Sequence, residues 1–306
     1  MPAADDPALR NRRRTWQGIA CIMAAFMLFA LLDTCSKYLS RYYPVSGLMW
    51  ARYVVHMVLM LLLFGPYMQL NLIYTARPGM QVLRGLLLTV TTFLFMSAIK
   101  YLPLAEASAI GFTSPLLLAA LSGPLLKEPA SRANWIAVCA GFCGVLIILR
   151  PGGGLLTPAV LLPLGMAVTN SLYHIVTRKL AARENPVTSL FYTALVGSVA
   201  MSVVAPFAWV TPSGTAHLAL LLALGVFGGA GHYLVFQAFR RAPPAVLGPF
   251  TYVHLIWACA LGYLVFDEFP DGWTLGGMGV IMASGLYIAF AERARLRAPA
   301  PAPVRG

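Results

Sequence analysis

The segment GIACIMAAFMLFALLDTCSKYLS, residues 18–40, decides the fold class of this chain. Residues 18–32 contain no charged side chain, and Asp33 and Lys37 then follow one helical turn apart. A helix that spans a lipid bilayer needs about 20 predominantly apolar residues. The segment therefore predicts a transmembrane helix with an acid and a base near one end. It exceeds the apolar region of about 7–15 residues found in signal peptides, so we expect it to be retained.

The composition extends this conclusion to the whole chain. Of its 306 residues, 59% are hydrophobic and 10% are charged, against roughly 25% charged residues in an ordinary soluble domain. The net charge of +12 comes from Lys and Arg residues that lie mainly in short connections between apolar runs. This distribution indicates membrane topology and not a nucleic-acid partner. We therefore predict a multi-pass protein of the inner (plasma) membrane, surrounded by the lipid bilayer.

Apolar runs between charged residues, prolines and turn residues give ten candidate transmembrane helices. On this scheme seventeen Lys and Arg residues fall on the side of the N-terminus and four on the other side, with Arg52 inside a span. Because cytoplasmic connections carry the excess of Lys and Arg, both termini are predicted to be cytoplasmic. The candidate spans are 18–40, 46–65, 78–98, 105–126, 132–149, 158–180, 187–209, 216–239, 245–266 and 271–291.

The two halves of the sequence resemble each other when one is shifted by 140 residues. The shift aligns Phe112 with Tyr252 and Pro103 with Pro243. Each half contains five predicted helices, an odd number, so the second copy enters the membrane from the opposite face. We therefore predict an all-α polytopic membrane protein built from two inverted five-helix repeats. Its parts are a basic cytoplasmic tail at 1–17, repeats at 18–150 and 158–291, and a disordered cytoplasmic tail at 292–306.

A family resemblance rests on four stretches, which are VLRGLLL (82–88), SAIKYLPLAEASAIGFTSPLL (97–117), LKEPASRANWIAVCAGFCGVLIILRPG (126–152) and FRRAPPAVLGPFTYVHLIWACALGYLVFDEFP (239–270). They resemble the EamA-type members of the drug/metabolite transporter superfamily, and the resemblance covers about 18–291. It implies ten helices in two inverted repeats and export or exchange of small metabolites. Relatives are associated with amino acids, sugars, vitamins such as riboflavin, and S-adenosylmethionine. Asp33 with Lys37, and DEFPD at 267–271, resemble the vitamin and S-adenosylmethionine carriers more than the aromatic amino-acid exporters.

Four charged residues are predicted to gather in the outer half of the first repeat. Asp33 and Arg52 lie at similar depth, whereas Lys37 and Glu106 lie nearer the outer face. On one interpretation Lys37 reaches the interface and Asp33 pairs with Lys37 or Arg52 for packing alone. On the other, the charges form an outer gate or coupling site. The second repeat has Ile175 where the acid would be, and this asymmetry favours a specific role.

Aromatic, histidine and amide side chains at mid-membrane depth are the candidates for solute binding, because they offer π faces and hydrogen bonds. Tyr252 and His254 are two residues apart and so point about 200° apart on a helix. Only one of them can face a cavity, and we favour Tyr252. The alternatives are helix packing for each histidine and interface anchoring for the aromatic residues. The full set is Tyr252, His254, Trp257, Tyr173, Asn170, Trp50 and His56.

The predicted function is secondary transport by alternating access, as an exporter or exchanger of a small amphipathic metabolite such as an amino acid, vitamin or nucleoside-like compound. The sequence contains no ATP-binding motif, nucleophile elbow or metal-ligand pair, so no cofactor and no metal are expected. Proton coupling and a homodimer stay open. The alternative is a membrane-embedded enzyme or small-molecule receptor, for which Asp33 with Glu106 is the candidate pair of acids.

Overall fold

The computed structural model describes residues 7–126, 132–150, 157–181 and 184–297. Within these ranges every regular element is a helix, and nine helical stretches are long and apolar enough to span a membrane. Hydropathy alone predicts these nine spans. The remaining candidate, 132–149, also forms a helix, but its apolar part, Trp135–Leu149, is shorter than the other nine.

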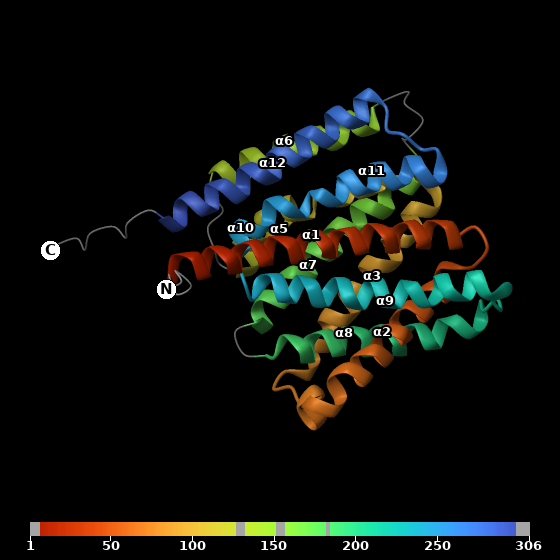
Figure 1. Ribbon diagram of the computed structural model, residues 1–306. Helices are drawn as coiled ribbons and strands as arrows, with labels where there is room; N and C mark the ends of the chain where they lie inside the picture. The colour runs from red at the N-terminus through yellow and green to blue at the C-terminus, as the bar shows by residue number, and fades with distance from the viewer. Residues whose placement is uncertain (1–6, 127–131, 151–156, 182–183, 298–306) are drawn as a thin grey trace, which may run out of the picture.

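The helices follow one another with short connections (Figure 1). Several begin where the sequence supplies a start signal. Pro78 and Pro186 occupy the first turn of α3 and α8, where a missing amide is tolerated, and the Asn185 side chain accepts a hydrogen bond from the Val187 amide at 2.9 Å. The helices are α1 (Pro7–Leu39), α2 (Val45–Met68), α3 (Pro78–Tyr101), α4 (Leu104–Gly111), α5 (Ser114–Leu126), α6 (Arg132–Leu149), α7 (Leu161–Ala181), α8 (Pro186–Val204), α9 (Gly214–Phe239), α10 (Pro244–Thr251), α11 (Val253–Phe266) and α12 (Gly272–Arg297), with 3₁₀ turns η1 (Gln69–Leu72), η2 (Pro158–Val160) and η3 (Ala205–Phe207).

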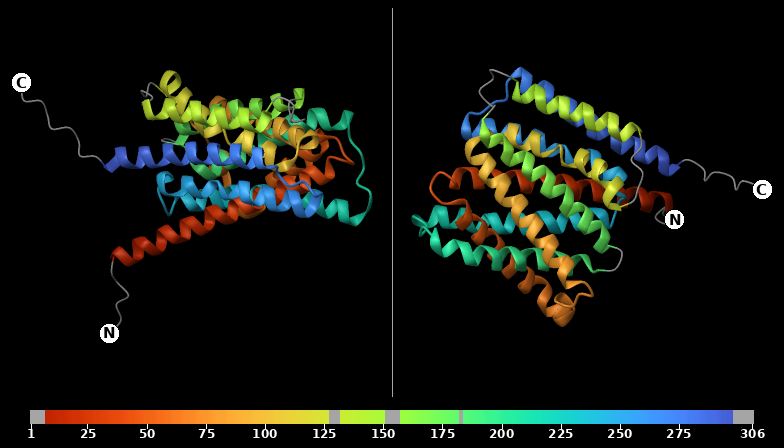
Figure 2. Two further views of the ribbon diagram at one scale, coloured as in Figure 1. Left: turned by 90° about the horizontal axis from the view of Figure 1, so that it is seen from above. Right: turned by 180° about the vertical axis from the view of Figure 1, so that it is seen from behind.

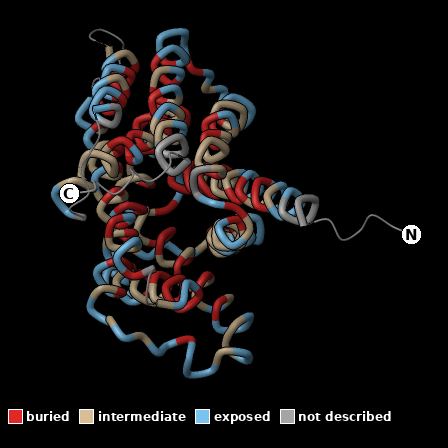
Figure 3. The backbone as a smooth tube through the Cα atoms, turned by 90° about the vertical axis from the view of Figure 1, so that its left-hand side faces the viewer, coloured by how far each residue is buried: buried red, intermediate tan, exposed pale blue. Residues whose placement is uncertain are grey.

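The bundle has two distinct ends. The start of α1 and the end of α12 lie at the same end, which we call the terminal end (Figure 1). The connections that follow α1 and α11 lie at the other end, which we call the far end (Figure 1). Buried positions follow the helix faces that meet inside the bundle, and exposed positions follow its outer faces (Figure 3). Because those outer faces carry many large apolar side chains, they are suited to contact with lipid.

Two predicted spans are each broken into two helices. The span 105–126 forms α4 and α5, and the break begins at Phe112. The span 245–266 forms α10 and α11, and the break lies at Tyr252. These two residues are the ones that the 140-residue shift aligns, and their rings lie 5.3 Å apart between centroids. The breaks therefore occur at matching positions of the two halves and meet each other inside the bundle.

Local sequence explains why these helices break. Pro115 lacks an amide hydrogen, and its ring collides with the carbonyl four residues earlier, at the end of α4. Pro249 removes an amide from the turn that precedes the second break. The hydroxyls of Thr113 and Thr251 each donate a hydrogen bond of 2.7 Å to the carbonyl three residues earlier, which satisfies an acceptor at the break.

A close helix crossing joins α6 to α12, which lie side by side at one edge of the bundle (Figures 1 and 2). Gly144 and Gly277 meet at this crossing. A Cβ added at Gly277 would lie 2.6 Å from the Gly144 carbonyl oxygen, and one added at Gly144 would lie 2.9 Å from the Gly277 carbonyl oxygen. Glycine is therefore required here for backbone approach, as in other closely packed membrane helices.

Candidate functional site

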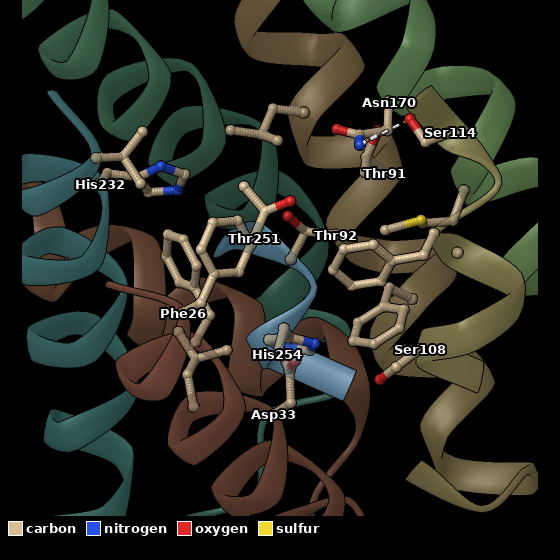
Figure 4. Close-up of a pocket in the computed structure, with 18 of the residues that line it drawn as sticks. Phe26, Asp33, Thr91, Thr92, Ser108, Ser114, Asn170, His232, Thr251 and His254 are labelled. Carbon is tan, nitrogen blue, oxygen red and sulfur yellow. Dashed lines mark hydrogen bonds and ion pairs between the residues drawn. The ribbon is translucent and has the colours of Figure 1, made fainter. Parts of the chain in front are cut away.

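A cavity of about 370 Å³ lies where helices from both halves of the chain meet (Figure 4). Its volume falls within the range of about 300–1,000 Å³ that is typical of small-molecule sites. The wall draws on α1 to α5 and on α7, α9, α10 and α11. The polar side chains in the wall are Asp33, Arg52, Thr91, Thr92, Ser108, Ser114, Asn170, His174, His232, Thr251 and His254.

Asp33 and His254 form a buried pair in this wall. The Asp33 Oδ2 and His254 Nε2 atoms lie 3.1 Å apart, and the pair joins α1 to α11 (Figure 4). The expectation that Asp33 pairs with Arg52 or Lys37 is therefore wrong. The reason is the packing of α1 against α11, which brings an imidazole beside the carboxylate from more than 200 residues away. The His254 Nδ1 atom is buried without a protein partner among the described residues.

His254, and not Tyr252, faces the cavity. The expectation that only one of the two can do so agrees with the structure, but the preference for Tyr252 does not. The Tyr252 ring packs on Phe112 and points toward α12, where a Cβ added at Gly285 would lie 1.4 Å from its hydroxyl. The break after Tyr252 then presents the next turn, including His254, to the cavity.

One side of the cavity is aromatic. Phe26 and Phe29 of α1 meet edge to face with centroids 5.7 Å apart, and Phe29 contacts the His232 ring of α9 at 5.0 Å. Phe112 lies 5.6 Å from the His254 ring. The His232 ring is nearly parallel to that of His56, at 6.1 Å. These rings offer flat faces to a planar solute.

Another part of the wall is polar and comes from α3, α5 and α7. The Asn170 amide nitrogen donates a hydrogen bond to the Ser114 hydroxyl at 3.0 Å (Figure 4). The Thr91 hydroxyl donates one to the Thr169 hydroxyl at 2.8 Å. Thr92 accepts a hydrogen bond of 2.9 Å from Tyr53. Of the residues that the sequence predicts for solute binding, Asn170 and His254 line the cavity.

Lys37 lies outside the cavity and forms a latch at the far end of the bundle. Its ammonium donates hydrogen bonds to Glu268 at 2.6 Å and to the Leu102 carbonyl at 2.8 Å. The Glu268 carboxylate also accepts a hydrogen bond from the Leu104 amide at 3.3 Å. The end of α1 is thereby tied to the α3–α4 and α11–α12 connections, which belong to different halves of the chain.

Glu106 lies beside this latch and not in the cavity. It is buried, and its Oε2 atom has no hydrogen-bond partner among the described residues. Asp33, by contrast, lines the cavity. The two acids therefore do not share one site, and the paired-acid arrangement expected of a membrane-embedded enzyme is not formed.

Tyr173 is held by a buried arginine instead of lining the cavity. Arg84 is one of the seventeen basic residues that the sequence places on the side of the N-terminus, but its side chain is buried, with only 4% of its surface exposed. Its guanidinium donates hydrogen bonds to Tyr173 at 2.7 Å, Thr177 at 2.9 Å, and Thr193 at 2.6 Å, and also to the Ser189 carbonyl at 2.8 Å. This cluster fastens α3 to α7 and α8.

Three other predicted binding residues also lie away from the cavity lining. Trp50 donates a hydrogen bond to Ser202 at 2.9 Å and stands edge to face with Trp209. His56 is buried behind His232. Trp257 has a buried indole nitrogen without a partner among the described residues. These three residues were predicted to bind solute because of their residue type and their depth in the membrane. Hydropathy does not indicate which face of a helix meets the cavity, so the sequence could not exclude them.

Several lining residues were not among the predicted site residues. His232 and His174 carried the same sequence signal as His254, a histidine inside an apolar run. Phe26, Phe29 and the hydroxyl residues carried no signal, because such side chains are common in any transmembrane helix.

The family of this chain is shown by comparison with known proteins. The model of the EamA-like transporter family matches twice, over residues 16–150 and 157–290. The chain is 29% identical to an S-adenosylmethionine uptake transporter of Rickettsia felis, over 90% of this chain and 93% of that protein. It is 27% identical to a riboflavin transporter of Vibrio cholerae, over 92% and 95% of the two chains.

A solved crystal structure has the same fold. It superimposes with a TM-score of 0.65 at 18% identity, covering 94% of this chain and 99% of that one. The matched family consists of transporters and not of enzymes, and together with the apolar helices it makes this a multi-pass protein of the inner membrane. The chain belongs to the EamA-like transporter family.

Proposed function

We propose that this protein is a secondary transporter that carries a small amphipathic metabolite across the inner membrane by alternating access. The observation that carries the proposal is the cavity, which has walls from both halves of the chain and both charge signs in its lining. A site between two halves can be exposed to either side as one half moves against the other. The word uptake in the name of the Rickettsia relative favours import over the export or exchange expected from sequence.

The cargo we propose joins a flat heteroaromatic ring to a polar chain. S-Adenosylmethionine and riboflavin, named for two relatives, both have this form. The aromatic side of the cavity, with Phe29, Phe112 and His232, suits the ring. Asn170 and Ser114 on the polar side suit hydroxyl and amine groups of the chain.

We further propose ten spans in two inverted repeats, 18–150 and 158–291, with both tails cytoplasmic. On this topology α6 also crosses the membrane, as the fifth span along the chain, and the terminal end faces the cytoplasm. The two matches of the family model and the paired breaks at Phe112 and Tyr252 support the duplication. A reporter fused after Arg183 or Arg241 is expected to read cytoplasmic, and one at Gly153 or Ser213 external. Reversed readings at Gly153 and Ser213 would contradict the inverted arrangement.

On this topology the structure corresponds to an inward-facing state. The lining reaches Phe239, the last residue of α9, at the terminal end. Toward the far end the lining stops at Asp33 on α1, and the Lys37–Glu268 latch lies one turn beyond it. We propose that this latch is the closed outer gate, with Glu106 beside it as a second carboxylate for Lys37.

Uptake into proteoliposomes tests the proposed function. Radiolabelled S-adenosylmethionine or riboflavin should accumulate with the wild-type protein and not in empty liposomes. Thr251→Trp should abolish this uptake because the larger side chain would fill the cavity. Leu62→Trp is the matched control, since Leu62 lies on the outer face of α2 with 67% of its surface exposed. Equal loss in both variants, or uptake of neither solute by the wild type, would count against the proposal.

A further inference from the structure

Arg52 on α2 is a cation whose hydrogen-bond donors have no acceptor among the described residues. It lines the cavity, but no carboxylate among the described residues lies within ion-pair distance and no described residue accepts a hydrogen bond from its guanidinium. Its recorded contact is with the ring of its neighbour Tyr53, 5.7 Å from Cζ to the centroid. Guanidinium carries five N–H donors in a planar fork.

Arg84 shows that an arginine inside this bundle can have its hydrogen bonds supplied by the protein. The Arg84 guanidinium lies outside the cavity lining and donates four hydrogen bonds to neutral protein acceptors. These hydrogen bonds join α3 to α7 and α8. The guanidinium of Arg52 has no such acceptors, although both arginines lie within the helix bundle. A charge kept at membrane depth without a partner is costly and marks a functional position.

The surroundings of Arg52 favour an anionic group. The side chain passes Gly228 of α9, where an added Cβ would lie 3.3 Å from the Arg52 Nε atom. His56 and His232, stacked on each other, are near enough to interact electrostatically with Arg52. The Nε2 atom of His56 is buried without a described partner. On this side of the cavity Arg52 therefore faces histidine rings and no carboxylate among the described residues.

Among the described residues, Asp33 is the one acid in the cavity lining, and its partner is His254 and not Arg52. One acid and one unpaired guanidinium in the same cavity match a zwitterionic head group, whose ammonium can approach Asp33 while its carboxylate approaches Arg52. A dianionic phosphate would meet one arginine and be repelled by Asp33. Guanidinium binds carboxylate through two parallel hydrogen bonds, which gives both energy and orientation.

We infer that Arg52 binds the carboxylate of the transported solute, so that the cargo is an α-amino acid joined to a ring system and not a neutral flavin. This inference rests on the proposed function and selects between the two kinds of cargo that it allows. It assigns Arg52 a binding role in place of the ion pair with Asp33 expected from sequence.

Two pairs of compounds that differ in one carboxylate test the inference. The first pair is S-adenosylmethionine and its decarboxylated form, and the second is tryptophan and tryptamine. Affinity is measured by thermal stabilisation of the purified protein in detergent. The wild type should bind the carboxylate member at least tenfold more tightly. Arg52→Gln should abolish that preference, and Arg52→Lys should keep part of it because the charge remains.

Arg150→Gln is the matched control, because Arg150 is an arginine at the far end whose charge is paired with Asp271. It should leave the carboxylate preference unchanged. Equal affinity of the wild type for S-adenosylmethionine and its decarboxylated form would overturn the inference while leaving the proposed cargo intact. A second outcome is that neither adenosyl compound binds, while the wild type prefers tryptophan to tryptamine and Arg52→Gln loses this preference. That outcome would support the inference and reject S-adenosylmethionine as the cargo. Failure of both carboxylate compounds to bind the wild type would overturn the inference.

Discussion

The carboxylate of Asp33 and the imidazole of His254 lie 3.1 Å apart and connect the first helix of the chain to the eleventh, inside the cavity. Both side chains can exchange a proton, and both would meet the solute. The other charged or titratable side chains in the cavity lining are Arg52, His174 and His232. We propose that this pair couples binding of a cationic group to movement of a proton.

Asp33→Asn should flatten the pH dependence of transport while leaving the protein folded. Asparagine keeps the size of the side chain and its hydrogen bond to His254, but it cannot take up a proton. Uptake by proteoliposomes at several pH values between about 5 and 8 measures the effect. Glu184→Gln is the control, because Glu184 accepts hydrogen bonds from Thr75 and Ala76 outside the cavity. A wild-type pH profile in Asp33→Asn would assign the pair to packing alone.

Breaking the Lys37–Glu268 latch should open the cavity to the outside. We expect Lys37→Met to raise the rate at which an impermeant external thiol reagent labels Ser108→Cys, in a background without native cysteines. The expected increase is about tenfold, which corresponds to the loss of about 1.4 kcal/mol of gate closure. Lys100→Met, a second lysine at the far end that does not join the latch, is the control. Unchanged labelling in Lys37→Met would show that the latch does not close the cavity.

The α6–α12 crossing should tolerate no side chain at Gly277. Gly277→Ala places a Cβ 2.6 Å from the Gly144 carbonyl oxygen, so the two helices must separate. Overpacking of this kind costs about 1–3 kcal/mol, and the melting temperature in detergent should fall. Gly276→Ala is a close control, since an added Cβ there meets nothing within 4 Å. Equal melting temperatures for the two variants would mean that the helices adjust without cost.

The start of α12 should lose stability in acid. Asp271 accepts a hydrogen bond of 2.8 Å from the Thr274 amide, and this bond, with help from Arg150, lowers the pKa of Asp271 in the folded protein. Its contribution is therefore present above the unfolded-state pKa of about 3.9 and is lost as the pH falls through the lower folded-state pKa. Asp271→Ala should cost about 0.5–2 kcal/mol at pH 7, the usual loss of a helix cap.

The measurement is the difference in melting temperature between wild type and Asp271→Ala at several pH values. The difference should shrink as the pH falls below 4, because protonation removes the acceptor charge that the variant already lacks. Asp267→Ala is the control, since Asp267 lies in the same connection without capping α12. A difference that does not depend on pH would show that charge contributes nothing to the cap.

The sequence by itself determined the membrane class, the positions of the spans and the family. Those features depend on local quantities, namely about 20 consecutive apolar residues per span and motifs read in order along the chain. The predicted span 78–98, for example, corresponds to α3, Pro78–Tyr101. The one-turn spacing of Asp33 and Lys37 also followed from the sequence, because it is set by helix geometry.

Only the tertiary structure decided which partners these charges take and which helix faces line the cavity. Asp33 contacts His254, and Lys37 contacts Glu268, each across more than 200 residues. Such pairs depend on how helices rotate and cross, and in a membrane protein both the lipid-facing and the inward-facing sides are apolar, so hydropathy cannot tell them apart. The choice between Tyr252 and His254 also depended on packing. The Tyr252 ring packs toward α12, and His254 lines the cavity.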